Sequence, residues 1–357
     1  MFSLPEFRIG AEVGIKHIND NGGINGAKIN VHFCAEDATP EGAVNCGNRM
    51  VEDKVDAVYA GLDVASDAML PILSQAGIPY LSSQAWGDVQ KKDPNSHILH
   101  SANEAFFIGG YKVFADKGVK TAVHFVEDTP AGRQAIVSMA AAAEKVGIKS
   151  DGQTVDPANP DWGSAVAAAQ AKNPEMIYSS LSEPGCLGMV GAARQFNFTG
   201  YIVAGSCTQY INSLGEPAIG TYTHIDVWTP DSKSFAPDAV KAQLEQFETD
   251  MTAAGQEQYI PSFGIVTYAA MIEFGEILRT IPDGTDIDAK SIASALDNAK
   301  GIPGFLGGDL DCTKHAFATE PRACRGTIMV YEVVAGDDGK PVRKPLFQEM
   351  LDTTDLA

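Results

Sequence analysis

The stretch SDAMLPILSQAGIPYLSS, residues 66–83, decides the fold class of this chain. Its apolar residues predict a helix over Ser66–Gln75, and Gly77 separates that helix from an apolar strand over Ile78–Leu81. A second short apolar strand, Val55–Ala60, precedes the helix. Strand, helix and strand in this order predict two parallel strands joined by a right-handed crossover.

The same alternation continues along most of the chain. Upstream, a helix is predicted over Pro5–Asn19, an alternating strand over Lys28–Phe33, and a helix that Thr39 caps and Pro40 begins. The pattern predicts an α/β fold with two doubly wound parallel sheets. Downstream, strands are predicted near 122–126, 176–179, 202–204 and 327–333, and helices near 106–117, 132–146, 162–172, 186–195, 237–254, 262–280 and 289–299.

Length and charge limit the classes of partner. The 357 residues exceed the size at which one core stops growing, so two lobes are expected, and apolar residues make up 45%. The net charge of −20 repels nucleic acid and anionic lipid headgroups, so neither is an expected partner. No apolar run reaches the roughly 18 residues that span a bilayer.

The cysteines and the N-terminus point to different compartments. Six cysteines allow 15 pairings, and proximity in sequence suggests Cys34–Cys46, Cys186–Cys207 and Cys312–Cys324. Six free thiols are the alternative, and no ligand spacing favours zinc. Disulfides indicate an oxidising compartment, yet Met1–Glu6 carries no export signal.

Motifs of catalysis are missing from the sequence. No GxGxxG, P-loop or GxSxG is present. His97 and His100 lie in an extended stretch, which places them on opposite faces, and His124 is expected to be a core histidine. The acidic pair Asp309 and Asp311 is expected to be solvated. The chain is therefore predicted not to be an enzyme and to need neither metal nor cofactor.

Five stretches resemble the branched-chain amino acid binding family, the type I periplasmic solute-binding proteins of ABC importers. They occur in the family's order and cover nearly the whole chain. They are Gly10–Gly26 with its IND-NGG-ING run, Leu73–Ser83, Val266–Ala270, Ala299–Gly304 and Arg325–Gly336.

The resemblance implies two lobes joined by a three-crossover hinge. The N-terminal lobe would comprise residues 1–101 and 230–300, and the C-terminal lobe residues 102–229 and 301–357. A ligand would sit between them at the C-terminal ends of the strands, where helix N-termini attract a carboxylate. Hinge closure would bury the ligand. The partner would be a membrane permease, and the protein a monomer in the periplasm or at the cell surface.

The resemblance also projects a set of ligand-binding residues onto loops of this chain. In the first lobe these are Leu62, Asp63, Val64, Ser83, Gln84, Ala85, Trp86 and Phe263. In the second lobe they are Thr129, Pro130, Ala131, Ser182, Glu183 and Ser206.

Two departures from the family bear on the ligand. Relatives that bind aliphatic amino acids place a carboxylate opposite the ligand ammonium where this chain has Ser206, and aromatic residues where it has Ala131 and Ser182. A buried ammonium without a counter-charge is costly. Asp63 or Glu183 could replace the missing charge; otherwise the ligand is a bulkier carboxylate or carbonyl compound without an amine.

Two other functions remain open at this stage. One is a cytoplasmic ligand sensor of the same fold, such as an antitermination regulator of an amidase operon, which the missing export signal favours and disulfides would oppose. The other is an α/β enzyme with an unrecognised site.

The family's first strand, central in the first sheet, has no counterpart here. Its absence would leave buried backbone groups unpaired. We therefore expect a truncated start, with that strand and an export signal upstream.

Overall fold

The computed structural model describes residues 4–357, apart from the side chain of Pro130. The chain forms two compact units, Met1–Asn103 with Asp238–Thr327 (unit 1) and Glu104–Pro237 with Ile328–Ala357 (unit 2). It passes from one unit to the other three times. No helix in the described part of the chain is long and apolar enough to cross a bilayer.

Unit 1 is built on a parallel four-stranded sheet in the order β1-β2-β3-β11. Thr39 caps α2 by accepting a hydrogen bond from Gly42 N at 3.1 Å, and Pro40 is its first residue, as predicted. The elements are α1 (Pro5–Asp20), α2 (Pro40–Glu52), β1 (Val58–Ala60), α3 (Ser66–Ala76), β2 (Tyr80–Ser82), α4 (Asp88–Lys92), β3 (Ser96–Ser101), α10 (Asp238–Ala253), α11 (Gly264–Leu278), α12 (Ala289–Asp297), β9 (Lys300–Ile302), β10 (Leu310–Asp311) and β11 (Ala323–Arg325).

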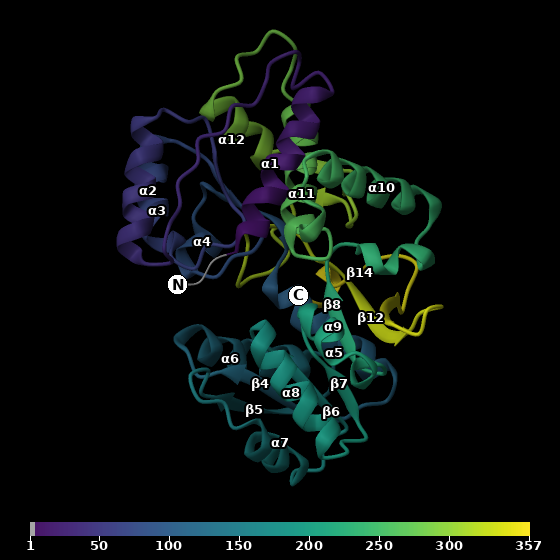
Figure 1. The fold of residues 1–357 in the computed structure, drawn as a ribbon. Helices are drawn as coiled ribbons and strands as arrows, with labels where there is room; N and C mark the ends of the chain where they lie inside the picture. The colour runs from purple at the N-terminus through teal and green to yellow at the C-terminus, as the bar shows by residue number, and fades with distance from the viewer. Residues whose placement is uncertain (1–3) are drawn as a thin grey trace. The chain divides into compact units, whose positions relative to one another are not determined.

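Helices α1 and α11 pack closely in unit 1 (Figure 1). A Cβ on Gly10 would lie 2.0 Å from the carbonyl oxygen of Gly264, and one on Gly14 would lie 2.9 Å from Cβ of Met271. Both glycines are therefore required by the approach of the two backbones, and buried apolar residues of α11, α12 and the sheet complete this core.

Unit 2 is built on a larger mixed sheet in the order β13-β12-β8-β7-β6-β4-β5, with β14 paired to β12. Strands β8 to β5 are parallel, and β12 is antiparallel to β8 and β13. The elements are α5 (Asn103–Asp116), β4 (Thr121–Glu127), α6 (Pro130–Lys145), β5 (Lys149–Val155), α7 (Trp162–Gln170), β6 (Met176–Ser180), α8 (Glu183–Gln195), β7 (Tyr201–Val203), α9 (Gln209–Leu214), β8 (Tyr222–Ile225), β12 (Thr327–Ala335), β13 (Pro341–Pro345) and β14 (Leu351–Asp352).

Helices cover both faces of the sheet in unit 2. On β6, Ile177 joins the core beneath α8, whereas the next residue, Tyr178, packs edge-on against Tyr111 of α5 at 4.8 Å between ring centroids. On β4, Phe125 meets Trp162 of α7 at 6.0 Å. Alternate residues of these strands are thus buried on opposite faces, as a doubly wound parallel sheet requires.

The predicted α/β fold with parallel sheets is confirmed, and so are all three cysteine pairs: Cys34–Cys46, Cys186–Cys207 and Cys312–Cys324 are disulfides. The core position of His124 is also found, since its Nδ1 lies 2.6 Å from Ser150 Oγ and its side chain is fully buried.

The strand predicted over Lys28–Phe33 is wrong. This segment forms no ladder with any described strand. Its start is held instead by Asn19, whose side chain pairs with the N–H and C=O of Ile29 at 2.8 and 2.9 Å. The alternation of its side chains is that of a strand, but a neighbouring strand at hydrogen-bonding distance is lacking.

Residues 301–327 group with unit 1, whereas the resemblance implied that they belong with the C-terminal lobe. The reason is local pairing. Strand β10 pairs with β9, and β11 pairs with β3 of unit 1.

Candidate functional site

The loop after β1 carries the first group of predicted residues, Leu62, Asp63 and Val64. Asp63 is buried, and its carboxylate accepts hydrogen bonds from Ala65 N at 2.8 Å and from Tyr80 OH at 3.3 Å. Val64 is 54% exposed. The carboxylate thus shapes the loop before α3, and the side chain of Val64 and the backbone are what the loop offers to a ligand.

A second carboxyl, Glu36, lies beside Asp63. Burial, followed by the negative charge of Asp63, raises the pKa of Glu36 to about 7, and burial also raises the pKa of Asp63. Oε2 of Glu36 is buried without a hydrogen-bond partner among the described residues. The pair therefore retains a proton near neutral pH.

The loop after β2 carries Ser83, Gln84, Ala85 and Trp86. Ser83 is buried, with its hydroxyl 2.7 Å from Tyr59 OH, whereas the Trp86 side chain is 39% exposed. A short loop that ends in an exposed indole can present that ring to an apolar ligand.

A buried amide, Gln90, holds this loop. Its Nε2 donates to Ser82 Oγ at 2.8 Å and to the carbonyl of Gln84 at 3.0 Å, and its Oε1 accepts from Trp86 N at 2.8 Å. Oε1 also accepts from Ser66 Oγ at 3.1 Å, which connects the loop to the start of α3. Sequence analysis missed Gln90, because a glutamine in a polar helix gives no sign that it is buried.

Phe263, the last predicted residue of unit 1, is the N-cap of α11. Its ring stacks on that of Phe7 from α1 with 6.0 Å between centroids.

In unit 2, the predicted residues lie where strands end and helices begin. Thr129 caps α6 by accepting from Gly132 N at 3.0 Å, and Ser182 caps α8 by accepting from Gly185 N at 3.4 Å. Pro130 and the exposed Ala131 are the first residues of α6, and the Pro130 side chain lies outside the described part. Because β4 and β6 are neighbouring parallel strands, both helix N-termini lie at one edge of the sheet.

Glu127 at the end of β4 connects these two turns. Its Oε1 accepts from Ser182 N at 3.2 Å and from the Ser182 hydroxyl, and its carbonyl accepts from Thr129 N at 2.8 Å. Sequence analysis missed Glu127, although its place at the carboxyl end of a predicted strand could have indicated it.

Glu183 is committed to the turn before α9. Its Oε1 accepts from Thr208 N at 2.7 Å, and its Oε2 accepts from Gln209 N at 2.9 Å. Burial raises the pKa of Glu183, and these backbone N–H groups oppose the shift. Like Asp63, this carboxylate shapes a loop.

Ser206 ends a buried chain of hydrogen bonds. Tyr178 OH donates to the Phe106 carbonyl at 3.1 Å, so Nε2 of His224 must donate to the Tyr178 oxygen at 2.7 Å. Nδ1 of His224 is then an acceptor, and the Ser206 hydroxyl lies 3.5 Å from it. Burial lowers the pKa of His224 to about 3, so the imidazole is neutral at pH 7.

The structure thus gathers the predicted residues into two groups, one at a sheet edge of each unit. Within the described residues, no three His, Cys, Asp or Glu side chains are placed to hold a metal ion. The two groups consist of helix N-termini, hydroxyls, an indole and carboxylates that already accept hydrogen bonds from backbone N–H groups.

Comparisons with known proteins agree with this architecture. A model of the periplasmic binding protein family matches residues 2–337. A comparison with curated protein sequences finds no significant match.

Among solved structures, an ABC transporter substrate-binding protein from Sphaerobacter thermophilus is 17% identical with a TM-score of 0.80, over 98% of this chain and 95% of that one. A leucine-, isoleucine-, valine-, threonine- and alanine-binding protein from Brucella ovis is 18% identical with a TM-score of 0.78, over 96% and 90%. A solute binding protein of an ABC transporter from Rhodopseudomonas palustris, in complex with 3,4-dihydroxybenzoic acid, is 19% identical with a TM-score of 0.74, over 98% and 92%. At these identities the likeness is one of fold.

Proposed function

We propose, from the premise that the chain belongs to the periplasmic binding protein family, that it is the extracytoplasmic solute-binding component of an ABC importer. The observation that carries the proposal is the match of the family model over residues 2–337. In both units, parallel strands are followed by loops that lead into helix N-termini. The permease of the importer would be its membrane partner, and a monomer its working form.

The ligand we propose is a small organic acid that carries a carboxylate and no amine. The helix N-terminus capped by Thr129 favours a negative charge, whereas at the start of α8 the carboxylate of Glu127 already accepts hydrogen bonds from Ser182. The carboxylates of Asp63 and Glu183 each accept backbone N–H groups, and Ser206 is uncharged. An ammonium would therefore meet no uncommitted carboxylate among these predicted residues, at a cost of several kcal/mol if it were buried.

The related structures include proteins for both kinds of solute. One is named as a leucine-, isoleucine-, valine-, threonine- and alanine-binding protein, and another is in complex with 3,4-dihydroxybenzoic acid. The exposed indole of Trp86 and the small side chains of Ala131 and Ser182 favour the aromatic acid for this chain.

Isothermal titration calorimetry with benzoate and with leucine tests the ligand class. We expect saturable one-to-one binding of benzoate or its dihydroxy derivative. Leucine should bind at least about tenfold more weakly, because each increment of about 1.4 kcal/mol in the cost of burying its ammonium lowers the affinity tenfold. Tight leucine binding without benzoate binding would reject the organic acid and leave the transport function intact. Turnover of either compound would instead support an enzyme.

The disulfides support the extracytoplasmic location. All six cysteines are paired, which favours an oxidising compartment over the cytoplasmic sensor. Thiol titration of protein isolated from its native cells, in denaturant without reductant, should find no free thiol; six free thiols would favour the sensor.

A further inference from the structure

The turn between β7 and α9 of unit 2 is fixed on both sides of Ser206. The carbonyl of Gly205 accepts hydrogen bonds from His224 N at 2.9 Å and from Thr223 Oγ1 at 2.6 Å. On the other side, Cys207 is joined to α8 by its disulfide, and its carbonyl lies 2.9 Å from the same threonine hydroxyl. Because the backbone before and after Ser206 is held in this way, the Ser206 side chain has a defined place at the edge of the sheet.

The direction of the hydrogen bonds behind Ser206 is set from the interior. The Tyr178 hydroxyl has one hydrogen and donates it to the Phe106 carbonyl at 3.1 Å. Nε2 of His224, 2.7 Å from the same hydroxyl oxygen, must therefore carry the imidazole hydrogen and donate it. Burial lowers the pKa of His224 to about 3, so the imidazole is neutral and has one N–H only. Its other nitrogen, Nδ1, is left as an acceptor.

Ser206 supplies the hydrogen that Nδ1 of His224 can accept. Its Oγ lies 3.5 Å from Nδ1, and the histidine is 2% exposed. A buried acceptor without a donor is unfavourable, so the Ser206 hydrogen is directed inward, toward His224. A hydroxyl has one hydrogen and two lone pairs. On the side that faces away from His224, the Ser206 oxygen can therefore only accept a hydrogen bond.

We propose that Ser206 binds a hydroxyl group of the ligand, so that the site prefers an aromatic acid with a phenolic O–H to the same acid without one. The inference rests on the proposed ligand class, an aromatic acid without an amine. The phenolic O–H donates to the Ser206 oxygen. His224 and Tyr178 are positioning residues, because they fix the direction of that hydrogen bond without touching the ligand.

The same direction separates the two ends of the ligand. A carboxylate presents only lone pairs and is repelled by the lone pairs of Ser206, whereas the start of α6, capped by Thr129, favours a negative charge. β4, which leads into α6, and β7, which leads to Ser206, lie on either side of β6. Two strand spacings amount to about 10 Å. A benzene ring with a carboxylate and a hydroxyl at opposite positions, and one hydrogen bond at each end, suits this separation.

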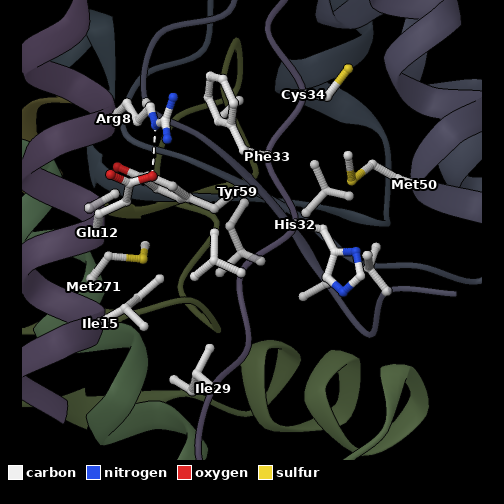
Figure 2. Close-up of a pocket in the computed structure, with 18 of the residues that line it drawn as sticks. Arg8, Glu12, Ile15, Ile29, His32, Phe33, Cys34, Met50, Tyr59 and Met271 are labelled. Atoms are coloured by element: carbon white, nitrogen blue, oxygen red, sulfur yellow. Dashed lines mark hydrogen bonds and ion pairs between the residues drawn. The ribbon is translucent and has the colours of Figure 1, made fainter. Parts of the chain in front are cut away.

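A groove of unit 1 is the other place where an aromatic acid could bind. Its volume is about 830 Å³, and Figure 2 shows Ile15 and Met271 among the apolar residues along its walls. The guanidinium of Arg8, which could meet a carboxylate there, is already paired with Glu12 at 2.7 Å. Binding in this groove would not depend on Ser206, which belongs to unit 2.

Calorimetric titration of three matched acids into the native protein tests the inference. Para-hydroxybenzoate can donate a hydrogen bond, para-methoxybenzoate has the same oxygen without the hydrogen, and benzoate has neither. We expect the hydroxy acid to bind at least about tenfold more tightly than each of the others, because these leave the Ser206 oxygen without a donor.

Two variants assign the preference to its residues. Ser206→Ala removes the acceptor; all three acids then bind more weakly, since His224 loses its partner, and the affinity ratio of hydroxy to methoxy acid should fall to about one. Tyr178→Phe frees the imidazole to carry its hydrogen on Nδ1 and donate to Ser206, so the ratio should fall by at least about threefold. Tyr201→Phe on β7 is the matched control and should keep the native ratio. A purely structural effect would weaken all three acids together and leave the ratio unchanged.

Each contrary result has its own meaning. Equal binding of the hydroxy and methoxy acids by the native protein would overturn the inference and leave the organic acid as ligand. A preference that survives in Ser206→Ala would also overturn it and would favour the groove of unit 1. If Ser206→Ala does not fold, the native titrations and Tyr178→Phe decide, and an unchanged ratio in Tyr178→Phe overturns the inference. Binding of none of the three acids would reject the proposed ligand class itself.

Discussion

Gln90 is the residue on which the predicted ligand loop of unit 1 depends. Five polar groups, on Ser66, Tyr80, Ser82, Gln84 and Trp86, bond to its amide, and the side chain is fully buried. Gln90→Ala would leave these groups without their partner.

We expect Gln90→Ala to lower the free energy of unfolding by about 2–3 kcal/mol, because buried polar groups lose their partners. It should also weaken ligand binding more than tenfold through disorder of the Trp86 loop. Thermal unfolding and calorimetry measure the two effects, and Gln258→Ala, at an exposed position, is the control. If the Gln90→Ala variant is less stable but binds the ligand with unchanged affinity, the Gln90 amide supports the fold and has no effect on ligand binding.

Glu36 predicts a pH dependence of stability. Its pKa is raised to about 7 by burial and by Asp63, so protonated Glu36 stabilises the fold at acidic pH and this contribution is lost as the pH rises through about 7. Because the side chain is about half-exposed, screening reduces the effect to about 1 kcal/mol.

Glu36→Gln should therefore unfold about 1–3 °C above the native protein at pH 8, with no difference at pH 4. Differential scanning calorimetry at the two pH values measures this, with the exposed Glu52→Gln as control. A gain that is equal at both pH values would show that the charge of Glu36 is not its cause.

At the scale of elements, the close contact of α1 and α11 makes the strongest prediction. Gly10→Ala places a Cβ 2.0 Å from the Gly264 carbonyl, so the helices must separate, and we expect a loss of about 2–4 kcal/mol. Gly191→Ala in α8 is the matched control. Its Cβ meets nothing within 4 Å, so helix propensity should raise stability by up to about 1 kcal/mol.

Denaturant unfolding of the two variants gives both values. Equal changes in the free energy of unfolding for Gly10→Ala and Gly191→Ala would mean that backbone entropy, and not the contact between α1 and α11, determines the effect of substituting Gly10.

The elements that could be predicted from sequence are those with local signals. Thr39 and Pro40 predicted the start of α2, the period of apolar residues predicted α3 to within one residue, and apolar runs predicted β4 and β6. The strand over Lys28–Phe33 was predicted from its alternation, but a strand exists only with a neighbour, and pairing is not local information.

The side chains of the site were predicted less well than their loops. The sequence places Asp63 and Glu183 after strands, as found, yet it does not tell which way a carboxylate turns. Both turn to backbone N–H groups. Gln90 and Glu127 act on the loops through distant partners, and such contacts follow only from the folded chain.

At the scale of the whole molecule, the question is whether both clusters of candidate residues affect the binding of one ligand. Each unit has its own sheet and its own cluster of loops, and the family model extends over segments of both. If the two clusters serve a single ligand, a change in either must weaken the same binding event.

Calorimetric titration of benzoate into the native protein, Trp86→Ala in unit 1 and Ser206→Ala in unit 2 tests this most directly. We predict one binding site in the native protein and at least about tenfold weaker binding in both variants, at unchanged stoichiometry. A loss in one variant with native affinity in the other would contradict the account, because the ligand would then belong to one unit alone.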